Sequence, residues 1–546
     1  MAYLDTYTTP LTEDTASHLL RRACFGPSRQ EIRNFKGMTA SQAVDLLIAN
    51  VSRTTFPTPP LDYNEMMPTA GQPFLSLPYN ISRNTEFATF YKYWWSALMV
   101  QKDGFPSVHE KLTLFWQNHF VVPQTFVVDY RFIDRYLRLL RDNCLGSFKF
   151  LATEITKDPA MLLFQNGNEN QKGYPNENYA RELQELFVVG QKDFYGNPNY
   201  TEDDVRAAAN VLTGWQVTNY LIDGSTTFDS VFAPLRHDTS DKIFSEKYNN
   251  TVISGQDGPE AGNIELNRLI SMLLAHSHTA KHICRKLYRW YVNTNVTEEI
   301  EENVITPLAS FFSSPENNFN IEPIIRKLLT SQIFFDKNNR GAIIKSPADL
   351  VIGMLRFFEQ PVPDGSTDYV AFRKYSEFVY AHLKDLDFPI LDQPTVFGYP
   401  AYYQIGYSKN WINGTSIGRR HNHMDRYFLA LYNYKIKPDY VLGIDLLAWL
   451  ARIQPNFSDV NGTPAITCEQ LLEAFSENLF TFPLDQSQKD FLIDNIMMRG
   501  VSRRNWISEL NYYRQTPDHV DRRHTVEARC RYLLRHMFRM AEFHVS

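Results

Sequence analysis

The sequence predicts a mainly α protein: a large multi-helix domain with a small β-hairpin element around residues 215–250. Most segments repeat their apolar residues with a period of about 3.6, which is typical of helices that bury one face. Hydrophobic residues make up 43% and aromatic residues 14% of the 546 residues, so a sizeable core can form. Around residues 215–250 the apolar residues alternate instead, with Asp223-Gly224 between them, which is typical of a hairpin.

The helical period predicts a succession of helices along the chain. We expect them at residues 16–23, 29–50, 84–103, 107–119, 128–142, 147–157, 176–190, 202–213, 264–275, 278–292, 322–331 and 346–358, with further helices from 424 to the end. Residues 54–82 hold six prolines and predict a loop. Residues 388–423, rich in Pro and Gly, predict a long ordered loop, and such loops in compact domains are often functional.

We expect two parts in this chain. Residues 1–300 would form a helical domain that carries the motifs described below and the minor β insertion. Residues 301–546 would form a helical C-terminal region packed on it, including the long loop 388–423.

The composition favours a protein that binds no nucleic acid and has no membrane span. The net charge is −6, and the arginines of the last fifty residues alternate with apolar residues as in an amphipathic helix. The five cysteines are widely spaced without a CxxC pair, which fits a reducing compartment. No signal peptide is visible, so we expect a cytoplasmic protein, or an exported one if a leader was removed. The longest apolar run, 440–453, is interrupted by Asp445 and is too short to span a bilayer.

The most informative stretch is 176–190, Asn-Glu-Asn-Tyr-Ala-Arg-Glu-Leu-Gln-Glu-Leu-Phe-Val-Val-Gly. On a helix, Asn178, Glu182 and Glu185 share one face, with Arg181 at its edge. The opposite face is apolar and consists of Tyr179, Leu183, Leu186 and Phe187. The polar face is either a solvated surface with ion pairs or the floor of a site. The residues alone leave both interpretations open.

Residues 107–119 predict a helix with Ser107 as N-cap and Glu110 as its capping-box partner. His119 would end an apolar stripe, where a histidine is either a hydrogen-bonded core residue or, tentatively, a metal ligand. The pair His109-Glu110 does not form a zincin motif, because Thr113 stands where the second histidine is required.

Two further polar segments follow the central helix. Thr201 and Asp204 predict a capping box at the start of the next helix. In the irregular region beyond it, His237 and Asp238 could act as a base and the carboxylate that orients it, with Lys242 close by. A simple turn at Asp238-Thr239-Ser240 explains the same residues, so both interpretations remain.

Gly414-Thr415-Ser416-Ile417-Gly418 matches the GxSxG pattern of serine hydrolases. That motif requires a buried strand before the serine, and the preceding Asn410-Trp411-Ile412-Asn413 is a poor strand. The acid of a triad would also have to precede a late histidine, which His519 or His524 could provide only by coincidence. The sequence therefore disfavours a serine hydrolase.

Several of these segments together resemble the bacterial domain-of-unknown-function 1800 family. The resemblance rests on residues 18–27, 115–120, 176–190, 200–205, 213–215, 237–239 with Lys242, 345–347, and more loosely on residues 393–419. It implies a helical protein of unsettled activity; many members are exported, and genes of a sulfatase-like family often lie beside theirs, which suggests a sulfatase-like protein partner. Where the family commonly has His-Asn-His-Phe, this chain has Gln117-Asn118-His119-Phe120, so a metal site that uses the first histidine would lack that ligand.

Two functional hypotheses follow. In the first, the protein is an enzyme that performs hydrolysis or transfer on a small anionic or carbohydrate-like (glycan) substrate, with a divalent metal as a conceivable cofactor. Its pocket would lie between the first helix, the central helix and the His237 loop. Candidate catalytic residues are Glu182, Glu185, His237 and Asp238, candidate substrate-binding residues are Arg22, Arg181, Asn178 and Lys242, and His119 is the metal-ligand candidate. In the second, the protein is a non-catalytic scaffold whose charged residues form a structural network, for example by pairing Arg21 or Arg22 with Glu182.

Overall fold

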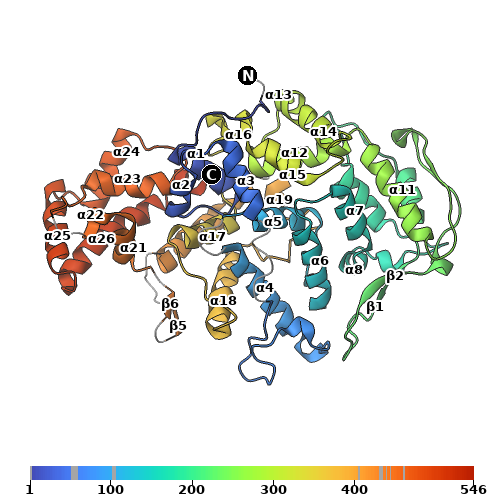
Figure 1. Cartoon of the computed structure of the whole chain (residues 1–546), viewed down its shortest axis with the longest axis horizontal. Helices are drawn as coiled ribbons and strands as arrows, with labels where there is room; N and C mark the ends of the chain where they lie inside the picture. The colour runs from blue at the N-terminus through green and yellow to red at the C-terminus, as the bar shows by residue number, and fades with distance from the viewer. Residues whose placement is uncertain are drawn as a thin grey trace.

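The computed structural model describes residues 3–50, 59–100, 106–403, 406, 408–428, 434–437, 440–442, 444–458 and 462–546. Helices make up 59% of the described residues, which confirms the predicted mainly α class. The strands form short antiparallel pairs. Figure 1 shows α11 and the β1–β2 hairpin at one end of an elongated molecule, the helices α21 to α26 at the other, and the first helices between them.

The first part of the chain is helical up to residue 211. It consists of α1 (Glu13–Ala23), α2 (Arg29–Phe35), α3 (Ala40–Ala49), α4 (Asn84–Val100), α5 (His109–His119), α6 (Tyr130–Asp142), α7 (Phe148–Lys157), α8 (Pro159–Phe164), α9 (Asn178–Glu182), a π-helix (Leu183–Val188) and α10 (Glu202–Val211). The expected single helix at 29–50 is wrong. It breaks after Phe35, because Gly37 has φ +86° and Thr39 caps a new helix.

The predicted β element is present. Strands β1 (Trp215–Thr218) and β2 (Asp229–Phe232) pair in register from Trp215–Phe232 to Thr218–Asp229, and β3 (Lys242–Ile243) pairs with β4 (Val252–Ile253). The chain then returns to helices: α11 (Ala261–Ala275), α12 (Thr279–Tyr291), α13 (Glu298–Ile300), a π-helix (Glu301–Ile305), α14 (Thr306–Phe312), α15 (Ile321–Leu329), α16 (Gln332–Phe335), α17 (Pro347–Phe357) and α18 (Tyr369–Asp385). The expected boundary at residue 300 falls inside the continuous helical run from α13 to α14.

The expectation of one long loop at 388–423 is wrong for its described residues from 400 onward. They contain α19 (Pro400–Tyr403), a 3-10 turn (Ser408–Trp411) and α20 (Gly414–His423). In the GxSxG segment, Asn413 caps α20 and the Ser416 hydroxyl accepts from the Asn413 backbone N–H in a capping box. A 3-10 turn, not a strand, precedes this serine, so the segment is not a nucleophile elbow.

The last part of the chain, from residue 424, is again mainly helical. It comprises a π-helix (Met424–Phe428), β5 (Tyr434–Lys437), β6 (Tyr440–Leu442), α21 (Leu446–Ile453), α22 (Pro455–Ser458), α23 (Cys468–Leu479), α24 (Gln486–Phe491), a π-helix (Leu492–Met497), α25 (Arg503–Gln515) and α26 (Val520–Met537). Residues 543–546 then run back to the start of α17, where the Lys345 N–H donates to the His544 carbonyl over 2.8 Å. The last residue thus lies beside α1 (Figure 1).

Buried tryptophans of α4 and α5, Trp94, Trp95 and Trp116, lie in the core. The Ser107–Glu110 capping box is wrong, because the Glu110 carboxylate turns inward. There it accepts from the Trp95 indole at 2.9 Å and from Arg141 at 2.6 Å. The Glu110 side chain therefore belongs to the buried core, although the local sequence predicted that it would cap the start of the helix.

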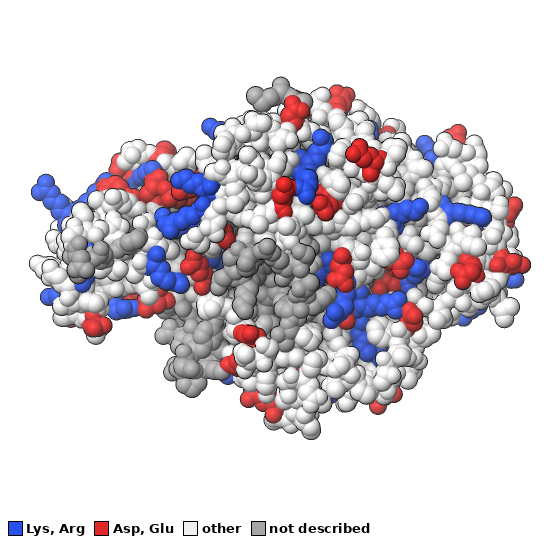
Figure 2. Space-filling view, viewed as in Figure 1, with Lys and Arg blue, Asp and Glu red and all other residues white. Residues whose placement is uncertain are grey.

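Acidic and basic side chains intermingle on the face of the molecule drawn in Figure 2. This mixture agrees with the small net charge of −6. Within the described ranges, no helix combines the length and the apolar composition needed to cross a membrane.

Candidate functional site

The central segment forms a helix that widens. α9 becomes a π-helix at Leu183, and π-turns inside helices frequently occur at functional sites. The predicted apolar face is confirmed for Tyr179, Leu183 and Phe187, which are buried, while Leu186 is half-buried. On the other face Asn178 is exposed, and Arg181, Glu182 and Glu185 are half-buried.

The end of the π-helix is held by three nitrogen groups from other helices. Carbonyls in the last turn of a helix lack helical partners. The Phe187 carbonyl receives a hydrogen bond from His119 Nε2 (2.9 Å), and the Leu186 carbonyl receives bonds from His282 Nε2 (2.9 Å) and Lys286 Nζ (2.9 Å). His119, at the end of α5, is therefore a support for the π-helix.

His119 has both ring nitrogens engaged. Its Nε2–H donates to a carbonyl, and its Nδ1 accepts from Lys286 Nζ at 3.0 Å. Burial and the Lys286 charge hold the pKa of His119 well below its ordinary value, and burial lowers the pKa of Lys286 to about 7. In this arrangement His119 has no lone pair for a metal. Among the described residues, no group of three or more His, Cys, Asp or Glu side chains could hold a metal ion.

Glu182 and Glu185 differ in their surroundings. Glu185 accepts a hydrogen bond from the Tyr200 hydroxyl at 3.0 Å. Glu182 forms no hydrogen bond or ion pair with the described residues. Burial, followed by repulsion from Glu185, raises the pKa of Glu182 to about 7, and Arg181 offsets part of the rise. One helix face therefore presents a carboxyl group that holds its proton near neutral pH.

The predicted substrate-binding residue Arg181 is committed to surface carboxylates. It binds Glu202 through two hydrogen bonds of 2.8 Å and Glu177 at 3.1 Å. Asn178 projects from the same exposed face, and its backbone N–H is capped by the Asn176 side chain at 3.0 Å. These two residues flank the acidic pair but do not pair with Glu182.

His237 and Lys242 lie in a buried ionic network around Glu265, a residue that no sequence motif singled out. His237 Nε2 contacts Glu265 Oε1 at 3.1 Å, and Lys242 Nζ donates to Glu265 Oε2 at 2.6 Å. The other ring nitrogen of His237 lies 2.9 Å from the Thr213 carbonyl. The side chains of His237, Lys242 and Glu265 are at most 1% exposed, so substrate cannot reach them without rearrangement.

Asp238 does not orient His237. Its Oδ1 accepts from the Ser240 N–H at 2.8 Å and from the Ser240 hydroxyl at 2.5 Å, which confirms the turn interpretation. The carboxylate that contacts the His237 ring is that of Glu265 on α11, and not that of Asp238 as expected. A signal for it was present, because Glu265 lies four residues before buried Leu269 on the apolar stripe of its helix. A carboxylate at such a position requires buried partners.

Arg21 and Arg22 are also far from their expected role. Arg22 is 2% exposed and donates to the carbonyls of Asn339 (2.8 Å), Val292 (3.1 Å) and Tyr291 (3.2 Å) and to a main-chain oxygen of Ser546. Arg21 donates to the Phe480 carbonyl at 2.8 Å and to the Thr481 hydroxyl at 3.2 Å. The expected pairing of Arg21 or Arg22 with Glu182 is wrong, and Arg22 belongs to a different region from the acidic pair.

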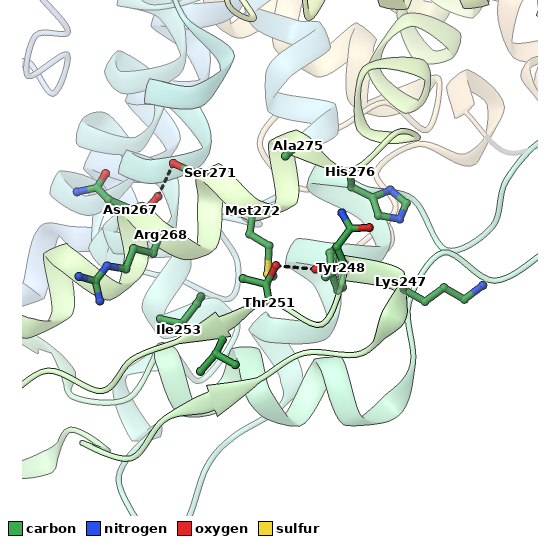
Figure 3. Close-up of a pocket in the computed structure, with 12 residues that line it drawn as sticks. Lys247, Tyr248, Thr251, Ile253, Asn267, Arg268, Ser271, Met272, Ala275 and His276 are labelled. Carbon is green, nitrogen blue, oxygen red and sulfur yellow. Dashed lines mark hydrogen bonds between the residues drawn. The ribbon is translucent and has the colours of Figure 1, made fainter.

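A cavity close to the central segment lies between α11 and the β3–β4 hairpin (Figure 3) and measures about 560 Å³. Met272 projects from α11 toward Tyr248 and Thr251 on the hairpin side, with Lys247 and His276 at one end and Arg268 toward the other (Figure 3). The Tyr248 hydroxyl donates to Gln184 at 2.8 Å, beside Glu185 in the sequence. Burial lowers the pKa of His276 to about 4. The Tyr248–Gln184 hydrogen bond thus connects one wall of the cavity to the π-helix.

Comparisons with known proteins assign the chain to a family. A family model described as "Protein of unknown function (DUF1800)" matches residues 18–544, nearly the whole chain. No curated protein and no solved structure matches it. The match covers the helical motifs and the long C-terminal part alike, so the chain belongs to the domain-of-unknown-function 1800 family.

Proposed function

We propose that this protein is an enzyme that performs hydrolysis or group transfer on an anionic or carbohydrate-like substrate at the polar face of α9 and its π-helix. The observation that carries the proposal is the state of Glu182. Its carboxyl group is half-buried, lacks a partner among the described residues and has a pKa raised to about 7. Perturbed titratable groups with access to solvent are characteristic of catalytic sites.

The two carboxyl groups suit acid–base chemistry. A pair of carboxyl groups whose environments separate their pKa values can divide the roles of proton donor and charged partner. In the proposal Glu182 donates a proton to the leaving group, and Glu185, fixed by Tyr200, supplies negative charge or activates water. Asn178 would contact the substrate at the edge of this face, and Arg181 would do so only by exchanging its bonds to Glu177 and Glu202 for the substrate. The nearby cavity lined by Tyr248, Asn267 and Arg268 offers polar and aromatic groups of the kind that bind sugars or anions.

A second candidate is the non-catalytic scaffold. The network of His237, Lys242 and Glu265 favours it, because each charged group there is buried and already paired. We therefore leave His237, Asp238 and Lys242 out of the proposed catalytic group. The two candidates make opposite statements about Glu182, which is catalytic in the first and dispensable in the second.

The test is a screen of the purified protein against 4-nitrophenyl phosphate, sulfate, acetate and β-glycosides between about pH 5 and 9. We expect turnover of at least one class, and Glu182→Gln should lower it by roughly 10²–10⁴-fold. The matched control is Glu177→Gln, the same substitution five residues earlier at the N-cap of α9, which should retain activity. In parallel, carbonyl ¹³C NMR would follow the Glu182 carboxyl against the Glu182→Gln spectrum. An inactive protein whose Glu182 titrates near pH 4.5 would favour the scaffold.

A further inference from the structure

Another cavity, of about 460 Å³, lies between α6, the end of α7, the β1–β2 hairpin and the start of α11. These elements are neighbours at one end of the molecule (Figure 1): α6 packs against α7 and α8, α8 against β1, and α7 against α11. Sites for small organic molecules typically measure about 300–1,000 Å³, so the volume suits such a ligand. We call this space the hairpin cavity. Its described lining residues differ from those of the cavity in Figure 3 and from the polar face of α9.

The lining of the hairpin cavity is mostly polar. Of its eleven lining residues, nine have polar or charged side chains, and one, Leu139, is aliphatic. Four of the nine are acids and two are bases. Both bases are already paired with acids of the same lining, because Arg135 binds Asp229 at 2.6 Å and Lys157 binds Glu154 at 2.8 Å. The described lining therefore offers many hydrogen-bonding groups but no unpaired base for a negatively charged ligand.

Asp158 is the buried acid of this lining. Its side chain belongs to a residue that is 2% exposed, whereas the other three acids are half-buried or exposed. Only Oδ1 is used by the fold, since it accepts from the N–H groups of Ala160 (3.0 Å) and Met161 (3.3 Å) as the cap of α8. Burial raises the pKa of Asp158 to about 7, and the charge of Arg135 offsets part of the rise. The second carboxyl oxygen forms no hydrogen bond with the described residues and remains free for a ligand.

Trp215, the first residue of β1, brings an unused donor to the same cavity. It is 5% exposed, and its indole N–H has no partner among the described residues. The indole packs against the Phe232 ring, with 5.4 Å between the ring centres, and Phe232 lies so close to Gly262 that a Cβ there would come within 2.4 Å of the ring. The hairpin and α11 thus fix the position of the indole. A buried N–H without an acceptor is unfavourable unless a ligand or an ordered water supplies one.

We propose that the hairpin cavity binds a neutral sugar residue, either as a free saccharide or as part of a glycan. A sugar hydroxyl both donates and accepts, so one sugar ring can donate to the Asp158 carboxyl group and accept from the Trp215 indole. Asn143, Ser230 and Asn263 provide further hydrogen-bonding groups for the remaining hydroxyls. A neutral ligand fits because the bases of the lining are paired and its acids would repel an anion. The site is separate from Glu182 and goes beyond the proposed catalysis.

The experiment measures the binding of defined sugars to the full chain by isothermal titration calorimetry and saturation-transfer difference NMR. The probes are glucose, galactose and N-acetylglucosamine, followed by cellotriose, galactotriose and chitotriose as models of glycans. We expect saturable binding of at least one probe. A trisaccharide that binds more tightly than its monosaccharide identifies a glycan as the source of the sugar, and equal affinities identify a free saccharide. Glucuronic acid that binds more tightly than every neutral probe would overturn the assignment of a neutral ligand.

Two substitutions locate the site. Asp158→Asn keeps a side chain that can cap α8 but removes the carboxyl group, and it should weaken binding roughly tenfold. Its matched control is Asp485→Asn, the same change at the cap of α24, which should leave the affinity unchanged. Trp215→Phe keeps an aromatic ring but removes the indole N–H, and it should weaken binding about 3- to 10-fold. Its control is Trp449→Phe, at another buried indole N–H without a described partner, which should have no effect.

The wild-type protein decides first, because the absence of saturable binding for every probe overturns the proposal. Losses of affinity in Asp485→Asn and Trp449→Phe that equal those in the cavity variants would also overturn it. If Asp158→Asn does not fold, Trp215→Phe and the wild-type measurements still decide. Glu182→Gln should bind the sugar as the wild-type protein does, so the outcome is independent of the proposed catalysis. Loss of binding in Glu182→Gln with full binding in Asp158→Asn would place the sugar on the polar face of α9 and reject the hairpin cavity.

Discussion

The network around Glu265 and the surroundings of Lys345 both bury a lysine, but the hydrogen-bond partners of the two ammonium groups differ. In the network, Lys242 donates to the Glu265 carboxylate at 2.6 Å, and the Gln256 N–H also donates to that carboxylate at 2.7 Å. At the second position, Lys345 donates to the carbonyl of Phe543. The first ammonium group therefore binds a carboxylate, whereas the second binds a neutral carbonyl. Hydrogen-bond satisfaction and charge compensation are thus separate properties of a buried site.

The partners of a buried charged side chain also help to distinguish a structural residue from one that binds a ligand. A histidine, a lysine and an acid in one short segment suggested catalysis in the sequence, yet Glu265 completes them as an internal network. The arginines of α1 were expected to pair with Glu182, and they donate instead to main-chain oxygens such as those of Phe480 and Asn339. Side chains that could catalyse a reaction or bind a ligand are better identified by the charges and hydrogen-bonding groups that remain unpaired than by residue type.

The largest expected effect comes from removing the carboxylate of the network. Glu265→Gln leaves Lys242 buried without a counter-charge and removes the carboxylate that contacts His237, so the free energy of unfolding should fall by about 3–5 kcal/mol. Urea denaturation followed by circular dichroism measures the loss. Glu260→Gln, at an exposed acid just before the same helix, should change stability by less than about 0.5 kcal/mol. Equal stability of the two variants would show that the network is not a structural ion pair.

The same substitution at the two lysines should have opposite effects on stability. Lys242→Met removes a cation from a paired acid and should cost about 2 kcal/mol. Lys345→Met removes a cation that has no paired carboxylate, and it should be neutral or stabilise the fold by up to about 1 kcal/mol. Denaturation in chloride buffer provides the comparison. A similar loss in both variants would contradict the distinction between the regions.

Helix content and some caps could be predicted from sequence because they depend on neighbours along the chain. The Thr201–Asp204 capping box is confirmed, with the Thr201 N–H donating to Asp204 at 2.8 Å. The Ser107–Glu110 box failed because Arg141, distant in sequence, pairs with Glu110 inside the core. The helix at 29–50 failed because a glycine with positive φ and a new cap interrupt its apolar period.

The candidate site was predictable only in part. The two faces of the central segment follow from helical spacing, and the structure has Glu182 and Glu185 on the more exposed face. The π-turn is not visible in that spacing, since it depends on His119, His282 and Lys286 binding the last carbonyls. Pairings such as Arg22 with the Asn339 carbonyl join residues from distant segments, which no local pattern specifies.

The smallest expected effect concerns Glu182, an uncompensated charge that solvent can reach. Its pKa is raised from the ordinary 4.5 to about 7, so the folded state holds this proton more tightly than the unfolded state does. Its contribution to stability is therefore fully present below pH 4.5 and is lost as the pH rises through about 7. Because solvent screens a half-buried group, we expect a loss of only about 1 kcal/mol. Glu182→Gln should abolish this part of the pH dependence in urea denaturation, whereas Glu177→Gln should preserve it. An unchanged slope in Glu182→Gln would mean that the charge of Glu182 is compensated in the folded protein, as that of Glu265 is.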